Sequence, residues 1–282
     1  MSSLTLSNDQ ILVRVAPDFG ARVTDLVDRR SGRNWLIAGA CEGDAGDAAA
    51  YGGNVARGWD ECAPTVAPCP DPDWGRDLRD HGDLWGRPWT VKRDDTGLAC
   101  HHEGTAFTFS RRLTLRGPRL VCDYAIAATT QTRMPWMWSQ HLLLATQPGE
   151  RIVLDGVGRW SDHGPKPATE QVLGTDSGLA QKTYGTVKDR ASVGIDGTDG
   201  AIRLEWSADQ MPFCGVWMAF GGWPTNEAPL HQMALEPTTA PAHNLADARA
   251  GGHEMWLEPG QSEHWQIVIT MLPPEQTNEG AR

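Results

Sequence analysis

The chain has 282 residues, of which 40% are hydrophobic, so it is long enough to bury the core of one large domain or two small ones. Its formal net charge is −11, and its 36 acidic residues are spread along the chain without forming an acidic tail. A net negative surface repels phosphate backbones and anionic lipid headgroups, so we expect neither nucleic acid nor a membrane as a partner.

The N-terminus, MSSLTLSNDQ, has no basic segment and no apolar run, so we do not expect it to be a signal peptide. The longest apolar runs, such as HLLLAT, are too short to span a bilayer. The six cysteines contain no CxxC pair and are expected to be free thiols, although a disulfide between Cys62 and Cys69 stays open. Free thiols are typical of a reducing compartment, so the sequence predicts a cytoplasmic protein.

Most segments of the chain have the pattern of short β-strands. They carry β-branched or aromatic residues, several alternate polar and apolar side chains, and Gly, Pro or Asp separates them. In chain order these segments are 10–17, 21–28, 106–117, 119–130, 151–156, 201–207, 215–220 and 264–272. The sequence RGPRL predicts a tight hairpin between two of them. Many short strands with no long helical period predict an all-β fold, a large antiparallel sandwich or barrel.

No linker or internal repeat divides the chain, so residues 1–282 are expected to form a single domain. Residues 38–54, AGACEGDAGDAAAYGGN, are small and polar, and we interpret them as an insertion in that domain. Residues 156–200 also read as loop-rich and polar. Long loops on a β scaffold commonly carry binding sites.

Three segments concentrate residues that could carry chemistry. In GWDECAPT, residues 58–65, Asp60 and Glu61 form either a polar turn or part of a site. In DHGDLWGRPW, residues 80–89, His81 and Arg87 lie among two tryptophans, two glycines and a proline. In MPWMWSQHLLLAT, residues 134–146, His141 lies in an apolar strand, where a histidine is more often a core residue than a functional one.

Glu236 occupies an unusual position in HQMALEPTTAPAHNL, residues 231–245. Proline cannot donate to the ladder of a central strand, so we expect a strand over His231–Leu235 that stops at Glu236-Pro237. The carboxylate would then lie where an ordered strand becomes a loop. A residue that merely ends a strand and faces solvent is the simpler interpretation, and a base at the rim of a pocket is the functional one.

Several familiar motifs are missing from the sequence. There is no GxSxG elbow, no P-loop, no GxGxxG and no HExxH. The adjacent His101 and His102 would point to opposite faces of a strand and are poor ligands for one metal ion. We therefore expect no metal and no cofactor.

Four segments in this order resemble aldose 1-epimerases, and more closely the divergent galactose-mutarotase-like proteins of bacteria. They are FGARVTDLVDRRSGRNWL, DHGDLWGRPW, PWMWSQHLLLA and MALEPTTAPAHNL, and together they span nearly the whole chain. The resemblance implies the large antiparallel β-supersandwich of galactose mutarotase. It also implies an isomerase that interconverts the α and β anomers of a sugar.

The resemblance assigns roles to individual residues. Glu236 in ALEP matches the family's catalytic base, and His141 in WSQH matches its general acid. His81 in DHGD matches a histidine that contacts the sugar ring. Arg87 is the candidate for an arginine that follows this histidine in related sugar-phosphate epimerases, although its spacing, HGDLWGR, is longer. We expect His81, Arg87, His141 and Glu236 to converge in one open cleft on the concave face of the sandwich.

The other expected sugar contacts are acidic and aromatic. Asp60 or Glu61 would replace the Asp that holds sugar hydroxyls in the family. Tryptophan is abundant, with 13 residues, and flat aromatic rings stack on the apolar faces of sugars. The candidates for the pocket floor and walls are Trp85, Trp138, Trp217 and Trp223.

Three alternatives stay open at this point. A carbohydrate-binding protein of the same fold could keep the pocket and lack the chemistry. A glycoside hydrolase would need two carboxylates, which Asp60 or Glu61 could supply together with Glu236. An epimerase for an acidic sugar is a third, because Arg22, Arg57 and Arg87 could bind a carboxylate. The sequence names neither the sugar nor the oligomeric state, and a homodimer is compatible with it.

Overall fold

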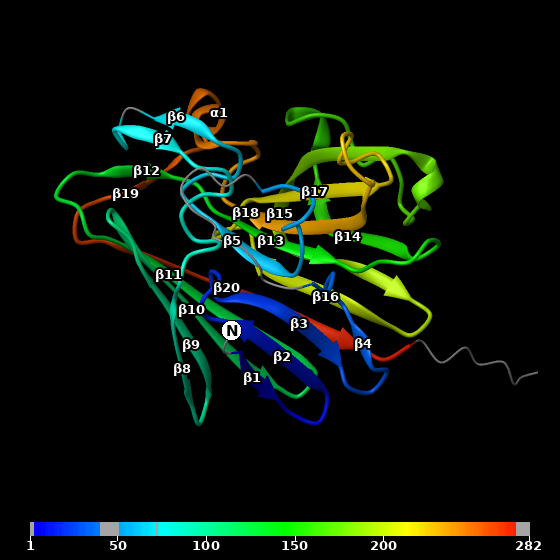
Figure 1. The fold of residues 1–282 in the computed structure, drawn as a ribbon. Helices are drawn as coiled ribbons and strands as arrows, with labels where there is room; N and C mark the ends of the chain where they lie inside the picture. Colours follow the sequence, from blue (N-terminus) through cyan, green and yellow to red (C-terminus); the bar gives the residue numbers. More distant parts are fainter. Residues whose placement is uncertain (1–2, 40–50, 72, 275–282) are drawn as a thin grey trace, which may run out of the picture.

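The computed structural model describes residues 3–39, 51–71 and 73–274, and nearly all of its regular structure is β (Figure 1). The strands of the first half are β1 (Leu4–Ser7), β2 (Ile11–Ala16), β3 (Arg22–Asp28), β4 (Arg33–Asn34), β5 (Trp59–Cys62), β6 (Cys69–Asp71), β7 (Arg76–Leu78), β8 (Thr90–Asp94), β9 (Gly97–Glu103), β10 (Phe107–Arg116) and β11 (Arg119–Ala128). Those of the second half are β12 (Met134–Trp136), β13 (Ser139–Leu144), β14 (Arg151–Gly158), β15 (Leu179–Gly197), β16 (Gly200–Ser207), β17 (Phe213–Phe220), β18 (His231–Thr238), β19 (Met255–Leu257) and β20 (Ser262–Leu272). Two 3₁₀ turns, η1 (Trp160–Asp162) and η2 (Thr175–Ser177), and one helix, α1 (Leu245–Ala250), complete the described elements.

Sixteen of the described strands form one antiparallel sheet. Its order is β1-β2-β3-β5-β13-β18-β17-β15-β16-β20-β11-β10-β9-β8, with β4 beside β3 and β14 beside β15. The short pairs β12-β19 and β6-β7 lie apart from it. The all-β antiparallel fold expected from the sequence is confirmed.

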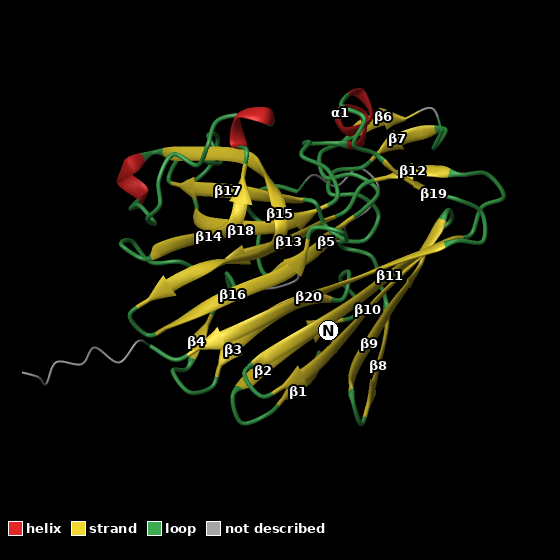
Figure 2. Ribbon diagram, turned by 180° about the vertical axis from the view of Figure 1, so that it is seen from behind, coloured by secondary structure: helices red, strands yellow, loops and turns green. Residues whose placement is uncertain are grey.

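The large sheet bends back on itself. Its two ends, β1–β3 and β8–β11, lie in the lower part of Figures 1 and 2, and β5, β13, β18, β17 and β15 lie in the upper part. The two ends touch, because Arg93 of β8 donates a hydrogen bond to the Thr5 carbonyl of β1 at 2.8 Å. The main core fills the space between the layers and includes Ile11 from one end of the sheet and Phe109 from the other.

Burial along the strands follows from this arrangement. β10 alternates buried and half-buried residues, as expected for a strand with one face on the core. Every residue of β5 and β13 is buried, and so is β18 after its first residue. Burial on both faces means that loops cover the outer face of these three strands. The candidate functional residues lie under that cover.

Most predicted strands are confirmed, including the hairpin in which Arg116 pairs with Arg119. The interpretation of 156–200 as loop-rich is wrong for its second half, because β15 runs over Leu179–Gly197. Its frequent Gly, Asp and Lys residues interrupt the apolar pattern by which a strand is recognised in the sequence. The structure pairs β15 with β14, β16 and β17, and these contacts override the weak local preference.

The predicted end of the strand before Glu236 is also wrong, because β18 continues through Glu236 and Pro237 to Thr238. On one side β18 pairs continuously with β17. On the other side its pairing with β13 is interrupted between Ser139–Thr238 and Leu143–Ala234. Pro237 lies within this interruption, where its missing N–H removes no ladder bond to β13.

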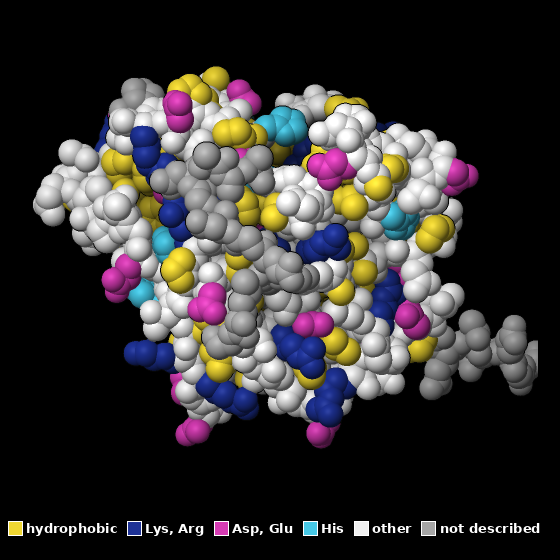
Figure 3. Space-filling model, in the orientation of Figure 1, with side chains coloured by type: hydrophobic (Ala, Val, Ile, Leu, Met, Phe, Trp, Pro, Cys, Tyr) yellow, Lys and Arg dark blue, Asp and Glu magenta, His cyan; other side chains and the backbone are white. Residues whose placement is uncertain are grey.

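The charged side chains on the surface and the state of the cysteines agree with what the sequence predicts. On the face shown in Figure 3, visible acidic and basic side chains are interspersed. The five cysteines that the structure describes are buried free thiols, which rules out the Cys62–Cys69 disulfide, and Cys41 lies outside the described residues. Across 3–39, 51–71 and 73–274, no helix is long and apolar enough to span a bilayer. The cytoplasmic location stays a prediction.

Candidate functional site

One row of side chains crosses five neighbouring strands of the large sheet. Asp60 of β5 pairs with His141 of β13, and the register of β13 with β18 places His141 opposite Glu236. Glu236 in turn pairs with Gly215 of β17, which pairs with Tyr184 of β15. Residues opposite one another in an antiparallel sheet share a face, so these five positions point to the outer, loop-covered face of the sheet.

Glu236 lies in the middle of this row and is 1% exposed. Its Oε2 atom accepts a hydrogen bond from the Ser139 hydroxyl at 3.3 Å and forms an ion pair with Nζ of Lys182. Its Oε1 atom lies 3.9 Å from Nε2 of His141 and has no hydrogen-bond partner in the described part of the chain. A buried polar atom without a partner is costly, so Oε1 is a candidate to bind a ligand.

The proton on the His141 ring can be assigned from its neighbours. The Tyr51 hydroxyl donates a hydrogen bond to Asp60 Oδ2 at 2.8 Å, because an ionised carboxylate can only accept. The Tyr51 oxygen is therefore free to accept from Nδ1 of His141, 3.3 Å away. Nε2 of His141 therefore faces Glu236. It carries a hydrogen only when the ring is protonated to the imidazolium.

The surroundings of His141 disfavour that imidazolium. Burial lowers the pKa of His141 well below its usual range, and the positive charges of His81, Lys182 and Arg22 lower it further. Arg22 is itself held by Asp60, with Nε and Nη2 at 2.9 and 2.5 Å from the two carboxylate oxygens. The ring is therefore mostly neutral near pH 7 and would be a strong acid once protonated.

A tight loop holds His81 and Tyr51 against each other. Their rings stack with centroids 3.8 Å apart and planes 15° from parallel. Asp80 joins them, because its Oδ2 accepts from the Tyr51 backbone N–H at 2.8 Å and its Oδ1 lies 2.7 Å from His81 Nδ1. The glycine after His81 is required, because a Cβ on Gly82 would lie 2.1 Å from the carbonyl oxygen of Ala63.

His141 and Lys182, two neighbours of Glu236, line a cavity of about 260 Å³ together with Tyr51 and His81, and Glu236 itself lies behind them. Its apolar wall consists of Val66, Ala67, Tyr184, Trp217 and Trp223. Its polar lining includes His81, His141, Lys182, Gln232 and His243. Pockets for drug-sized ligands span roughly 300–1,000 Å³, so this cavity suits one small molecule such as a monosaccharide. We call it the Glu236 pocket.

The two acidic candidates beside Trp59 do not offer a free carboxylate to this pocket. Asp60 is occupied by Arg22 and Tyr51. Glu61 follows Asp60 in the strand and points to the opposite, interior face. There it accepts hydrogen bonds from Arg111 at 2.8 Å, Trp59 and Trp138 at 3.0 Å and Tyr124 at 3.2 Å.

The four candidate tryptophans divide into two pairs. Trp217 and Trp223 are half-buried, line the Glu236 pocket and pack edge to face with centroids 5.8 Å apart. Trp85 lies behind Tyr51 with its ring edge-on, and it is fully buried. Trp138 points into the core with its indole N–H on Glu61. The structure therefore brings only the first pair to the pocket.

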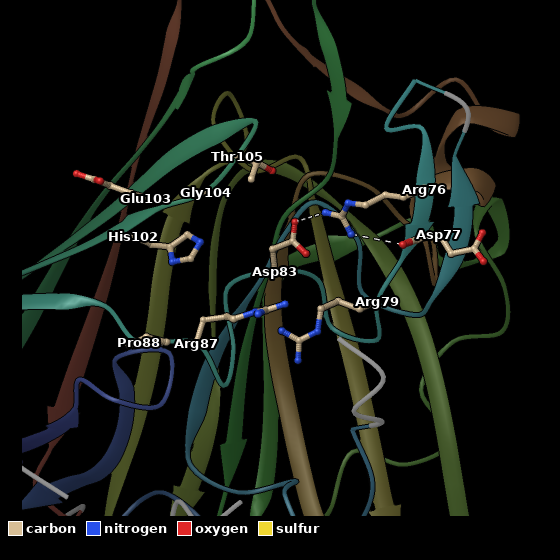
Figure 4. Close-up of a pocket in the computed structure, with 10 residues that line it drawn as sticks. All are labelled: Arg76, Asp77, Arg79, Asp83, Arg87, Pro88, His102, Glu103, Gly104 and Thr105. Atoms are coloured by element: carbon tan, nitrogen blue, oxygen red, sulfur yellow. Dashed lines mark hydrogen bonds and ion pairs between the residues drawn. The ribbon is translucent and has the colours of Figure 1, made fainter. Parts of the chain in front are cut away.

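Arg87 lies elsewhere, in a separate cavity of about 660 Å³ (Figure 4). Its neighbours there include Arg76, Arg79, Asp83 and His102, and an ion pair joins Arg76 to Asp83. His81 and His141 therefore share one cavity, Glu236 lies next to His141 without lining that cavity, and Arg87 lies elsewhere. The loop between His81 and Arg87 reverses its direction at Trp85. His81 and Arg87 therefore lie on opposite sides of this loop.

Sequence reasoning missed several residues that line or support the pocket. Tyr51 is one of only three tyrosines in the chain and stands in the segment interpreted as an insertion. Lys182 and Tyr184 alternate on β15, which was interpreted as a loop. Their spacing of two residues would have placed them on one face, had the strand been recognised. His243 follows β18 in the quoted segment APAHNL.

Comparison with known proteins identifies the fold. No known protein-family model and no curated protein sequence matches this chain. Solved structures match it. A candidate aldose 1-epimerase from Escherichia coli K12 superposes with a TM-score of 0.71 at 17% identity, and the match covers 96% of this chain and 99% of that chain. A galactose mutarotase related enzyme from Lactobacillus acidophilus gives a TM-score of 0.71 at 12% identity, with 98% and 99% covered.

A third solved structure, a galactose mutarotase-like protein from Lactobacillus casei, gives a TM-score of 0.68 at 13% identity. It covers 96% of this chain and 100% of that chain. Identities this low establish the fold and leave the activity to be argued from the site. The chain has the galactose mutarotase-like fold, as the four motifs predicted.

Proposed function

We propose that this protein is an aldose 1-epimerase that interconverts the α and β anomers of a monosaccharide. Glu236 is the base and His141 the acid. The proposal rests on one observation, that Nε2 of His141 lies 3.9 Å from the unpartnered Oε1 of Glu236 beside a cavity of monosaccharide size. A hydroxyl oxygen can lie within hydrogen-bond distance of both atoms, because 3.9 Å is less than two hydrogen-bond lengths.

Ring opening needs only two proton transfers, and ring closure needs the same two in reverse. Oε1 of Glu236 takes the proton of the C1 hydroxyl, and the electron pair of that O–H bond forms the C1=O bond. The C1–O5 bond breaks, and its electron pair takes the proton on Nε2 of His141. After rotation about the C1–C2 bond, the same steps in reverse close the ring on the other face. Positioned acids and bases act in this way without a covalent intermediate.

The partners of the carboxylates support this proposal over a glycoside hydrolase. A hydrolase would ordinarily place two carboxyl groups on either side of the scissile bond. Opposite Glu236 stands an imidazole, while Asp60 is taken by Arg22 and Glu61 by the interior network. Trp217 and Trp223 would stack on the apolar face of the sugar, and His81 would contact a ring hydroxyl.

The test is a panel of purified aldoses examined by NMR. Saturation transfer between the α and β C1 signals of D-glucose, D-galactose, D-xylose and L-arabinose measures anomer exchange directly. We expect at least one sugar to exchange faster with catalytic amounts of protein. A sugar that binds without faster exchange would favour the non-catalytic carbohydrate-binding protein.

The pH dependence of the rate follows from the proton that His141 must carry. The charged groups facing this ring are Arg22 on β3, Asp60 on β5, Lys182 on β15, Glu236 on β18 and His81 in the loop after β7. Because the pKa of His141 is lowered, its imidazolium form grows as the pH falls. We expect turnover to rise as the pH is lowered from 8 to 6, with a slope approaching roughly tenfold per unit. A rate that falls over this range would mean that His141 acts as a base.

Gly215 provides a test of the position of the carboxylate. A Cβ there would lie 3.0 Å from Glu236 Oε2 and 3.3 Å from Tyr184 Cε1, so the carboxylate would have to move. We expect Gly215→Ala to lower turnover by up to about 10²-fold, since a displacement of about 1 Å can cost that much. Unfolding temperature should fall little, because the Tyr184 ring borders the cavity and has room to shift. An unchanged rate would show that the carboxylate tolerates displacement.

A further inference from the structure

Lys182 reaches the centre of the site from the neighbouring strand. In the row next to that of Glu236, β15 places Lys182 opposite Trp217 of β17, which pairs with Ala234 of β18. Nζ of Lys182 forms an ion pair with Oε2 of Glu236, and a Cβ on Gly215 would lie 3.0 Å from the same oxygen, so the glycine leaves room beside it. The residue lines the Glu236 pocket and its side chain keeps 14% of its surface exposed.

The ammonium group has more donors than its protein contacts use. A lysine ammonium carries three N–H groups. Within residues 3–39, 51–71 and 73–274, Glu236 Oε2 is the only acceptor hydrogen-bonded to Nζ, and the Tyr184 ring lies 5.5 Å away. Two N–H groups of Lys182 are therefore available to a molecule in the pocket.

We propose that Lys182 contacts the substrate and orients the base. One N–H holds Oε2 of Glu236, so that Oε1 alone takes the proton of the C1 hydroxyl. A second N–H donates to the oxygen of a neighbouring sugar hydroxyl. This assignment rests on the proposed function, because it takes the bound molecule to be a sugar with C1 at Glu236.

The positive charge of Lys182 acts on both reacting groups. It is the counter-ion of a carboxylate that is almost fully buried, and a buried charge without such a partner is strongly disfavoured. It also contributes to the lowered pKa of His141, after burial and His81. Removing the charge should therefore let His141 bind a proton at higher pH. The other titratable groups around Glu236 include Asp60 and Cys62 on β5, Tyr184 on β15, Cys214 on β17 and His243 in the segment after β18.

The first test measures the imidazole of His141 directly and needs no sugar. The ¹³C NMR signal of this ring is assigned by its absence from His141→Asn and followed against pH. We expect its titration to move to higher pH in Lys182→Met, which keeps the length of the side chain and loses the charge. Lys188→Met is the matched control, because Lys188 lies on the same strand, is exposed and lines a different cavity.

The second test uses anomer exchange on the same aldose panel. Lys182→Met should lower turnover by roughly 10²-fold, the loss typical for removal of one positioned donor. The pH–rate profile that remains should be displaced to higher pH. Lys182→Arg keeps the charge and should keep the wild-type profile. Lys188→Met should match wild type in both respects.

The outcomes separate this proposal from the proposed function. Wild-type protein that accelerates no anomer exchange would contradict the epimerase, while a displaced His141 titration in Lys182→Met would still support the action of the Lys182 charge on the site. A Lys182→Met protein with an undisplaced His141 titration, or with wild-type turnover and pH profile, would overturn the assignment of Lys182.

Discussion

We expect Glu236→Gln to slow anomer exchange by roughly 10²–10⁴-fold, the usual contribution of a positioned base. Glutamine keeps the size of the side chain and can still hydrogen-bond the C1 hydroxyl, but it cannot accept its proton. Sugar binding should therefore survive. Saturation-transfer NMR measures the exchange rate, and a titration of the same sugar measures the affinity.

The structure adds a stability effect to this variant. Because Glu236 is buried and paired with Lys182, its replacement leaves an ammonium without its partner, and losing one member of a buried pair can cost about 3–5 kcal/mol. Glu150→Gln is the matched control, because Glu150 is also buried and lies 2.6 Å from Arg33, far along the sheet from the pocket. It should lose stability and keep the wild-type rate. A folded Glu236→Gln protein that exchanges anomers at the wild-type rate would refute the base assignment.

The second large effect is expected for His141→Asn, again roughly 10²–10⁴-fold in turnover. Asparagine can still donate to the Tyr51 hydroxyl, so the pocket should keep its shape, but it cannot carry a transferable proton. The pH dependence that we assign to His141 should disappear along with the rate. A variant that keeps the wild-type pH profile would show that the titrating group lies elsewhere.

Two comparisons sharpen the result for His141. His102→Asn replaces another buried histidine, which lines the cavity around Arg87, and it should leave the rate unchanged. In the double variant Glu236→Gln/His141→Asn, the two losses should be less than additive, because both groups act on one transition state. Full additivity would indicate that the two residues act in separate steps.

Strand prediction succeeded where local sequence and tertiary packing agree. The segment that became β10 alternates large apolar and polar residues, so its one-sided burial could be predicted from period two alone. β15 and the end of β18 were missed for opposite reasons. β15 lacks a strong apolar pattern, and Pro237 is a strand breaker that this sheet accommodates in an interruption of its pairing.

The candidate site was predictable to the extent that each residue belongs to a distinctive local segment. His81, His141 and Glu236 were selected from DHGD, WSQH and ALEP, and the structure brings these three together. Arg87 shares a segment with His81 and still lies in another cavity, because the turn of the loop reverses its direction. The short distance between His81 and Arg87 in the sequence does not reveal that they lie on different sides of that loop.

The sequence by itself determined the strands with clear alternation and the all-β class, which depend on residue type and on spacings of a few residues. The two groups proposed to exchange protons were implied by the resemblance of the sequence to aldose 1-epimerases. Only the tertiary structure decided which side chains meet. The register of β5, β13, β18, β17 and β15 places Asp60, His141, Glu236 and Tyr184 in one row. The same register brings Lys182 to Oε2 of Glu236 and points Glu61 into the interior. Register is a property of two paired strands, and a shift of one residue exchanges the two faces of a strand. When the paired strands are far apart in the sequence, the local sequence of either strand does not reveal the register.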